Sequence, residues 1–199
     1  MGGERSDEGG GPVSALIAVT GATGTIGRRV CEHALAGGMR VRALVRDPER
    51  AAEVVSEGAE VVRASFDDPD LASAFEGADA AFVVAPIRPD TVELGTRVHD
   101  ALEQAGVRRA VRLSVITPIA ASDSFLGRFH TELDADFASR GFAGAVVRPH
   151  AFMETLLGSA AQIAEGKLVG ANADGRTPYI AESDVALCAA VLAASDAGV

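Results

Sequence analysis

The chain has 199 residues, of which 48% are hydrophobic and 23% are charged, and its formal net charge at pH 7 is −10. This length is enough for one substantial core, and the acidic balance excludes a general nucleic-acid binder, which needs clustered Lys and Arg. Cys31 and Cys188 lack the spacing of a metal site or a redox pair. We interpret both as small buried residues of a reduced compartment, and we expect no metal site.

The first 12 residues are rich in glycine and charge and lack the apolar region of a signal peptide, so we expect a flexible tail. No apolar run reaches the roughly 18 to 20 residues that span a bilayer. The sequence therefore predicts a cytoplasmic protein with neither a membrane nor a nucleic acid as a partner.

From residue 13, short apolar runs alternate with longer amphipathic stretches, which is typical of βαβ units around a parallel sheet. The predicted strands cover residues 14–20, 40–45, 59–63, 80–85, 110–114 and 144–148. The predicted helices cover residues 25–37, 48–57, 90–105 and 123–140. The fold class is therefore α/β, a Rossmann-type doubly wound parallel sheet. We interpret three arginines near the fifth strand, Arg108, Arg109 and Arg112, as a solvated edge.

The stretch VTGATGTIG, residues 19–27, lies at the turn from the first strand to the first helix. Gly21, Gly24 and Gly27 allow a tight bend, a close approach of a diphosphate to the backbone, and close packing of the helix on the sheet. Free amides at the helix start then meet the anion. The other candidate contacts of this turn are the hydroxyl donors Thr20, Thr23 and Thr25, together with Ile26. The turn predicts a dinucleotide site.

The end of the second strand indicates which dinucleotide is bound. NAD binders usually place a carboxylate there for the ribose 2′-hydroxyl, whereas NADP binders need a positive charge for the 2′-phosphate. Here Val45 is followed by Arg46, and Asp47 is placed to cap the helix that begins at Pro48. We therefore expect NADP(H) in preference to NAD(H).

These motifs, with VRALVRDPER, SFDDPDLASAFEGADAAFVV, AVRLSV and VVRPHAFMETLL, resemble the NmrA-like branch of the atypical short-chain dehydrogenase/reductase superfamily, over about residues 14–194. The resemblance implies that Ser65 and Phe66 lie against the adenine. It also implies that the nicotinamide ribose is flanked by Val84, Ala85 and Pro86.

The resemblance further divides the chain into a cofactor domain, residues 13–150, and a short substrate-lobe segment, residues 151–199, packed on the same domain. Relatives usually continue further to complete this lobe. Two alternatives stay open: a shallow or open pocket, and a pocket completed by the second subunit of a homodimer.

Ordinary members of the superfamily use a Tyr-x-x-x-Lys pair, in which the Tyr is the general acid or base and the Lys lowers its pKa, and this chain has no such pair. Its one tyrosine, Tyr179, and its one lysine, Lys167, both come late in the sequence. Instead, His130 and Asp134 are four residues apart on one predicted helix and share a face. His130 is a candidate to donate a proton or hold a substrate oxygen, with Asp134 orienting it. The alternative is an exposed or helix-stabilising pair.

Further candidates come from two strand ends. Ser114 ends the fifth strand, where the superfamily places its catalytic serine, and is a candidate to bond substrate or nicotinamide; a structural serine is the alternative. Pro149 is expected to shape the loop beside the nicotinamide, and His150 and Phe152 to face the substrate. For Phe152 and Met153, core packing is the favoured alternative.

Two functions follow from these observations. The first is an NADPH-dependent reductase of a quinone or a similar conjugated small molecule, because a hydroquinone anion is less basic than an alkoxide and needs less help from an acid. The second is a non-catalytic NAD(P) sensor that binds a protein partner, as in some NmrA-like proteins. An isomerase or epimerase is disfavoured because such enzymes usually keep the Tyr and Lys.

Overall fold

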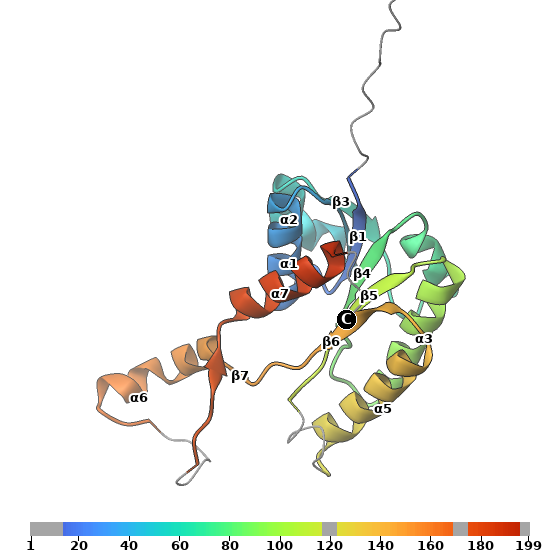
Figure 1. The fold of residues 1–199 in the computed structure, drawn as a ribbon. Helices are drawn as coiled ribbons and strands as arrows, with labels where there is room; N and C mark the ends of the chain where they lie inside the picture. The colour runs from blue at the N-terminus through green and yellow to red at the C-terminus, as the bar shows by residue number, and fades with distance from the viewer. Residues whose placement is uncertain (1–13, 117–122, 169–174, 196–199) are drawn as a thin grey trace, which may run out of the picture.

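The computed structural model describes residues 14–116, 123–168 and 175–195. Its central sheet has six parallel strands in the order β3-β2-β1-β4-β5-β6 (Figure 1). The strands are β1 (Leu16–Thr20), β2 (Arg40–Val45), β3 (Glu60–Arg63), β4 (Ala80–Val83), β5 (Arg109–Leu113) and β6 (Ala143–Val147). The strand order reverses between β1 and β4, where the carboxyl ends of an open parallel sheet form a ligand-binding crevice. The predicted Rossmann-type α/β fold is confirmed.

Helices cover both faces of the sheet (Figure 1). One face carries α1 (Thr25–Ala36), α2 (Ala52–Ser56) and α7 (Glu182–Ala194), and the other carries the 3₁₀ turn η2 (Leu71–Phe75), α3 (Thr91–Gln104) and α5 (Phe125–Ser139). The expected helix over residues 48–57 is broken, because the 3₁₀ turn η1 (Pro48–Ala51) precedes α2. Asp47 caps it as predicted, since its Oδ1 accepts a hydrogen bond of 3.1 Å from the Glu49 amide.

The inner strands explain the two-sided core. Every residue of β1 and β4 is buried, as expected for strands that helices cover on both faces. Val19 and Val30 of α1 belong to the core on one side, and Ala18 and Leu102 of α3 belong to the core on the other. The two cores fix the helix starts relative to the carboxyl edge of the sheet.

The last part of the chain leaves the sheet and returns to it. A second, two-stranded parallel sheet pairs β7 (Ala151–Phe152) with β8 (Tyr179–Ile180). Between them, η3 (Met153–Ser159) and α6 (Ala160–Ala164) extend away from the sheet and have no buried residue (Figure 1). Helix α7 then packs against α1.

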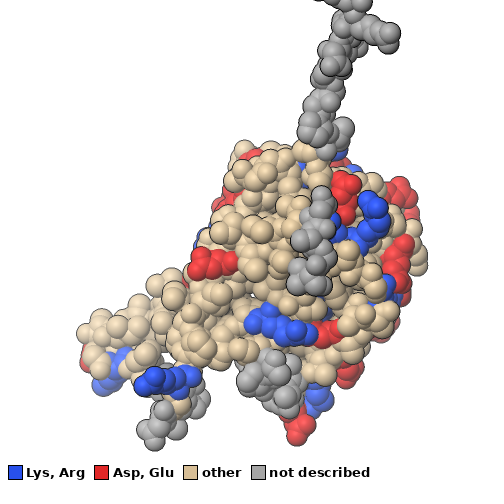
Figure 2. Space-filling model, viewed as in Figure 1, with Lys and Arg blue, Asp and Glu red and all other residues tan. Residues whose placement is uncertain are grey.

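Leu187 and Val191 of α7 are exposed. Where the surface over this helix is visible in Figure 2, it is mostly uncharged. Cys188 lies on the same helix and is exposed, so its predicted burial is wrong, whereas Cys31 is buried as predicted. Within the described residues, no helix combines the length and apolarity needed to cross a bilayer.

Candidate functional site

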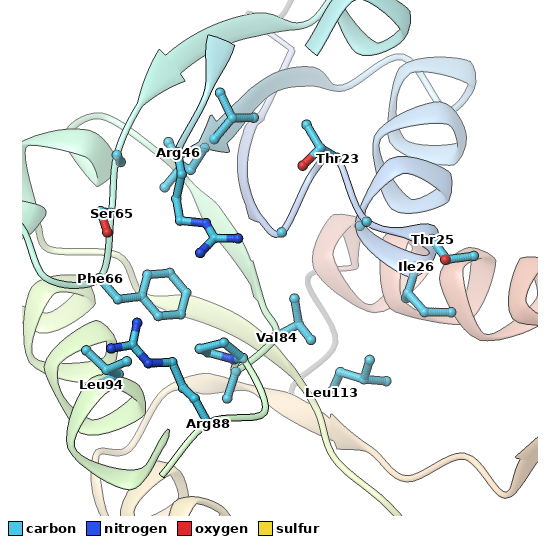
Figure 3. Close-up of a pocket in the computed structure, with 18 of the residues that line it drawn as sticks. Thr23, Thr25, Ile26, Arg46, Ser65, Phe66, Val84, Arg88, Leu94 and Leu113 are labelled. Atoms are coloured by element: carbon cyan, nitrogen blue, oxygen red, sulfur yellow. The ribbon is translucent and has the colours of Figure 1, made fainter. Parts of the chain in front are cut away.

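A cavity of about 530 Å³ opens at the carboxyl edge of the sheet (Figure 3). Its volume lies within the usual range of small-molecule sites. The predicted cofactor and substrate residues that line it are Gly21, Thr23, Gly24, Thr25, Ile26, Gly27, Arg46, Ser65, Phe66, Val84, Ala85, Pro86 and Phe152. Residues from distant parts of the sequence thus converge on one pocket.

The glycine turn brings α1 close to the end of β1. Gly21 adopts a left-handed backbone conformation with φ +62°, and a Cβ there would lie 2.6 Å from Cγ1 of Val84. A Cβ on Gly27 would lie 2.2 Å from the carbonyl oxygen of Gly21. Gly24 begins α1 without a side-chain cap. The first amides of α1 are therefore free for an anion at the cavity wall.

Thr20 does not serve as the predicted hydroxyl donor to a ligand. Its side chain is buried, and its hydroxyl donates to the carbonyl oxygen of Phe82 at 3.3 Å and accepts from the amide of Val84 at 2.9 Å. Thr20 instead joins the ends of β1 and β4 and so holds the two strands that flank the crevice. Thr23 and Thr25 do line the cavity.

Basic side chains gather at the end of the cavity near β2 and β3. Arg46 points into it beside Phe66 (Figure 3). Among the described residues, Arg46 has neither an ion-pair nor a hydrogen-bond partner, so its charge is free for a ligand. Arg88, on the loop after β4, also lines the cavity but forms ion pairs with Asp67 at 3.6 Å and Asp90 at 2.6 Å.

Glu182 is a lining residue that the sequence analysis did not single out. It is the first residue of α7, and its amide donates to the Glu154 carboxylate at 3.0 and 3.2 Å. Burial, followed by the charge of Glu154, raises the pKa of the Glu182 carboxyl. Acidic residues just before an apolar run, as in AESDVA, indicate a helix start but not the return of that helix to the cavity.

The candidate catalytic residues meet in a separate cluster where α5 packs on β5. The Asp134 carboxylate accepts hydrogen bonds from Arg112 Nη1, from Ser114 Oγ at 3.0 Å and from Arg148 Nε at 2.9 Å. Ser114 is buried, and Arg112 is only 1% exposed, so the prediction of a solvated edge is wrong for Arg112. A buried guanidinium is retained because the carboxylate pairs with it.

Leu113, which lies between Arg112 and Ser114 in the sequence, lines the cavity. His130, Ser114 and Asp134 are not among the lining residues. Pro149 and His150 are not lining residues either. The Pro149 carbonyl accepts from the Ile116 amide at 3.0 Å, which ties the chain after β6 to the chain after β5. His150 Nδ1 accepts from the Ala151 amide at 2.8 Å.

Comparisons with known proteins agree with this geometry. The chain is 32% identical over 176 residues to an NAD(P)H azoreductase from Xenophilus azovorans, covering 87% of this chain and 62% of the relative. It is 28% identical over 189 residues to quinone oxidoreductase 2 of Escherichia coli, covering 88% of this chain and 63% of the relative. The chain thus spans less than two thirds of the length of these relatives.

Solved structures show the same architecture. An NADPH-dependent quinone oxidoreductase of E. coli, in complex with NADPH, superposes with a TM-score of 0.82 at 26% identity, covering 92% of this chain and 66% of that one. A triphenylmethane reductase of Citrobacter sp., in complex with NADP(H), has a TM-score of 0.82 at 22% identity, with the same coverage of both chains, and shares the fold. The profile of a family described as NAD(P)H-binding matches residues 21–195. The chain therefore belongs to this NAD(P)H-binding family.

Proposed function

We propose that the protein is an NADPH-dependent reductase that passes hydride to a quinone or a similar conjugated acceptor. The observation that carries the proposal is the cavity, in which the uncapped start of α1 faces the unpartnered Arg46 across the carboxyl ends of the sheet. The names of the azoreductase and the quinone oxidoreductase support the same class of reaction.

The residues of the cavity suit a phosphorylated dinucleotide. Free amides of Thr25 and Ile26 at the start of α1 would hold the diphosphate. Phe66 would lie against the adenine, and Arg46 would pair with the 2′-phosphate, since a guanidinium forms strong charge-assisted bonds to phosphate. NADP(H) is therefore proposed over NAD(H).

The other end of the cavity suits hydride transfer. When bound, NADPH supplies hydride from its nicotinamide ring to the acceptor. Val84, Leu113 and Phe152 line the cavity with apolar surface, which would exclude water and hold the acceptor in line. A hydroquinone oxygen is weakly basic, so this reaction proceeds without the Tyr–Lys pair.

We propose that His130 and Ser114 are the polar groups that act on the acceptor, although neither lines the cavity, because Ser114 directly follows the lining residue Leu113. Asp134 positions Ser114 through the hydrogen bond at 3.0 Å. Replacing His130 with Ala is expected to lower turnover with little change in NADPH affinity. Unchanged turnover would remove His130 from the site.

The test has two stages. The purified protein is titrated with NADPH and NADH by fluorescence, and NADPH absorbance is then followed with a panel of quinones and azo dyes. Oxidation that depends on both acceptor and protein supports the reductase. Tight binding without oxidation across the panel would contradict it and favour the non-catalytic sensor, for which the missing Tyr-x-x-x-Lys pair is the supporting observation.

A further inference from the structure

The contact between β5 and α5 determines the hydrogen bonds of Asp134 as well as the position of His130. Both oxygens of the Asp134 carboxylate accept hydrogen bonds: Oδ1 accepts from Arg112, and Oδ2 accepts from Ser114 and Arg148. Asp134 forms no hydrogen bond with His130 in the described part of the chain. The expected orientation of His130 by Asp134 therefore does not run through a direct bond.

Arg112 makes that contact instead. Its Nη2 lies 3.3 Å from Nδ1 of His130. A guanidinium has only donors, so Nδ1 must be the acceptor and the ring proton must be on Nε2. Asp134 holds the other arm of the same guanidinium. The Asp134 carboxylate thus contacts the Arg112 guanidinium, which in turn contacts the His130 imidazole.

We propose that Arg112 is a positioning residue that keeps His130 neutral with its proton on Nε2, so that His130 offers a hydrogen-bond donor and not an acid to the acceptor. This inference rests on the proposed reductase function for its catalytic meaning. The tautomer of His130 is a property of the protein without ligand, and it is tested independently of the reductase function.

Electrostatics support the same state. Burial first, and then the charge of Arg112, lower the pKa of His130 to about 4, against the opposing effect of Asp134. The other charged groups around this contact are Arg148, which bonds Asp134, and Asp136, which acts on Arg112. At neutral pH the ring is therefore uncharged and has no spare proton to give.

The Nε2–H remains available. Among the described residues, the fully buried side-chain nitrogens and oxygens without a hydrogen-bond partner are Arg29 Nε, Asp90 Oδ1 and His99 Nε2. His130 Nε2 is not one of them, so solvent reaches it. A fixed N–H near a carbonyl oxygen stabilises the negative charge that grows there when hydride arrives. In this scheme hydride reduces the quinone, the oxygen charge is held by His130 Nε2–H, and water supplies the proton that completes the hydroquinone.

The test is a proton–nitrogen correlation spectrum of protein labelled with ¹⁵N-histidine, recorded from pH 4 to 8. The chain has four histidines, and loss of one signal set in His130→Asn assigns His130. We expect an unprotonated Nδ1 and a protonated Nε2, with no protonation of the ring down to about pH 5. A proton on Nδ1, or titration near the ordinary pKa of 6.5, would overturn the proposal.

Variants distinguish the effect of Arg112 on the His130 tautomer from the effect of neighbouring residues. In Arg112→Met, Nδ1 loses its donor, so we expect the tautomers to mix and the His130 pKa to rise from about 4 toward 6.5. Arg112→Lys restores a donor and should retain the Nε2–H form. Arg148→Met is the matched control, because it removes a bond to Asp134 and leaves the Arg112–His130 contact intact. An unchanged spectrum in folded Arg112→Met would exclude Arg112 as the positioning residue.

If Arg112→Met does not fold, the wild-type spectrum and Arg112→Lys still decide the tautomer. Activity gives an independent readout: turnover of the wild type should stay flat from pH 6 to 8, and an inflection from His130 would contradict the proposal. Absence of NADPH oxidation with every acceptor would refute the reductase while leaving the spectroscopic result as it stands.

Discussion

Replacing Gly27 with Ala is expected to damage both stability and cofactor binding. The new Cβ would lie 2.2 Å from the carbonyl oxygen and 2.6 Å from the carbonyl carbon of Gly21. Both atoms are backbone, so α1 must move away from the turn. Overpacking of this kind costs about 1–3 kcal/mol, and displaced α1 amides would no longer meet a diphosphate.

Urea and thermal denaturation measure the effect. A loss of about 2 kcal/mol in the free energy of unfolding corresponds to a drop in Tm of roughly 4–8 °C for a chain of this size. Gly158→Ala is the matched control, because its Cβ would meet nothing within 4 Å and should change stability by less than about 0.5 kcal/mol. A Gly27→Ala protein with wild-type Tm and wild-type NADPH affinity would refute the reasoning.

Three further predictions concern charge and reactivity. Arg46→Ala should weaken NADPH binding about 10- to 100-fold, as loss of a charge-assisted bond implies, and leave NADH nearly unchanged in the same titration; equal weakening would disprove the 2′-phosphate contact. Cys188 should react with a thiol reagent in the native protein while Cys31 does not, because burial raises the pKa of the Cys31 thiol to about 12; mass spectrometry of labelled peptides decides this, and rapid native labelling of Cys31 would contradict it. The fold lowers the pKa of His130 from 6.5 to about 4. Its contribution to stability is therefore present above pH 6.5 and is lost as pH falls toward 4, and this loss is on the order of 3 kcal/mol. His130→Asn should lose less stability than wild type between pH 6.5 and 4, and parallel curves of stability against pH would contradict the pKa shift.

Local patterns in the sequence are sufficient for the scaffold and for one end of the site. Apolar runs and glycine stops depend on neighbours in sequence, so the predicted bounds of the six central strands agree with the structure to within two residues at each end, whereas β7 and β8 are not among the predicted strands. The glycine turn and Arg46 each follow a strand directly, and parallel strands bring their carboxyl ends to one edge. The cavity therefore contains the predicted residues of the cofactor end.

The remaining features depend on packing between distant segments. Arg112 is buried because Asp134, 22 residues away, faces it from α5, and composition alone favours a solvated arginine. The Thr20 hydroxyl donates a hydrogen bond to Phe82 of β4, 62 residues away. Glu182 reaches the cavity only because the chain leaves the sheet through α6 and returns as α7. None of these contacts leaves a periodic signal.

The central claim is that the cavity holds NADPH and that hydride passes from it to a conjugated acceptor. The most direct measurement is an anaerobic single turnover, in which protein saturated with NADPH is mixed with a quinone and both NADPH loss and hydroquinone formation are followed. We expect equal amounts of NADPH consumed and hydroquinone formed, at a rate far above that of the mixture without protein. NADPH that stays reduced while bound would contradict it.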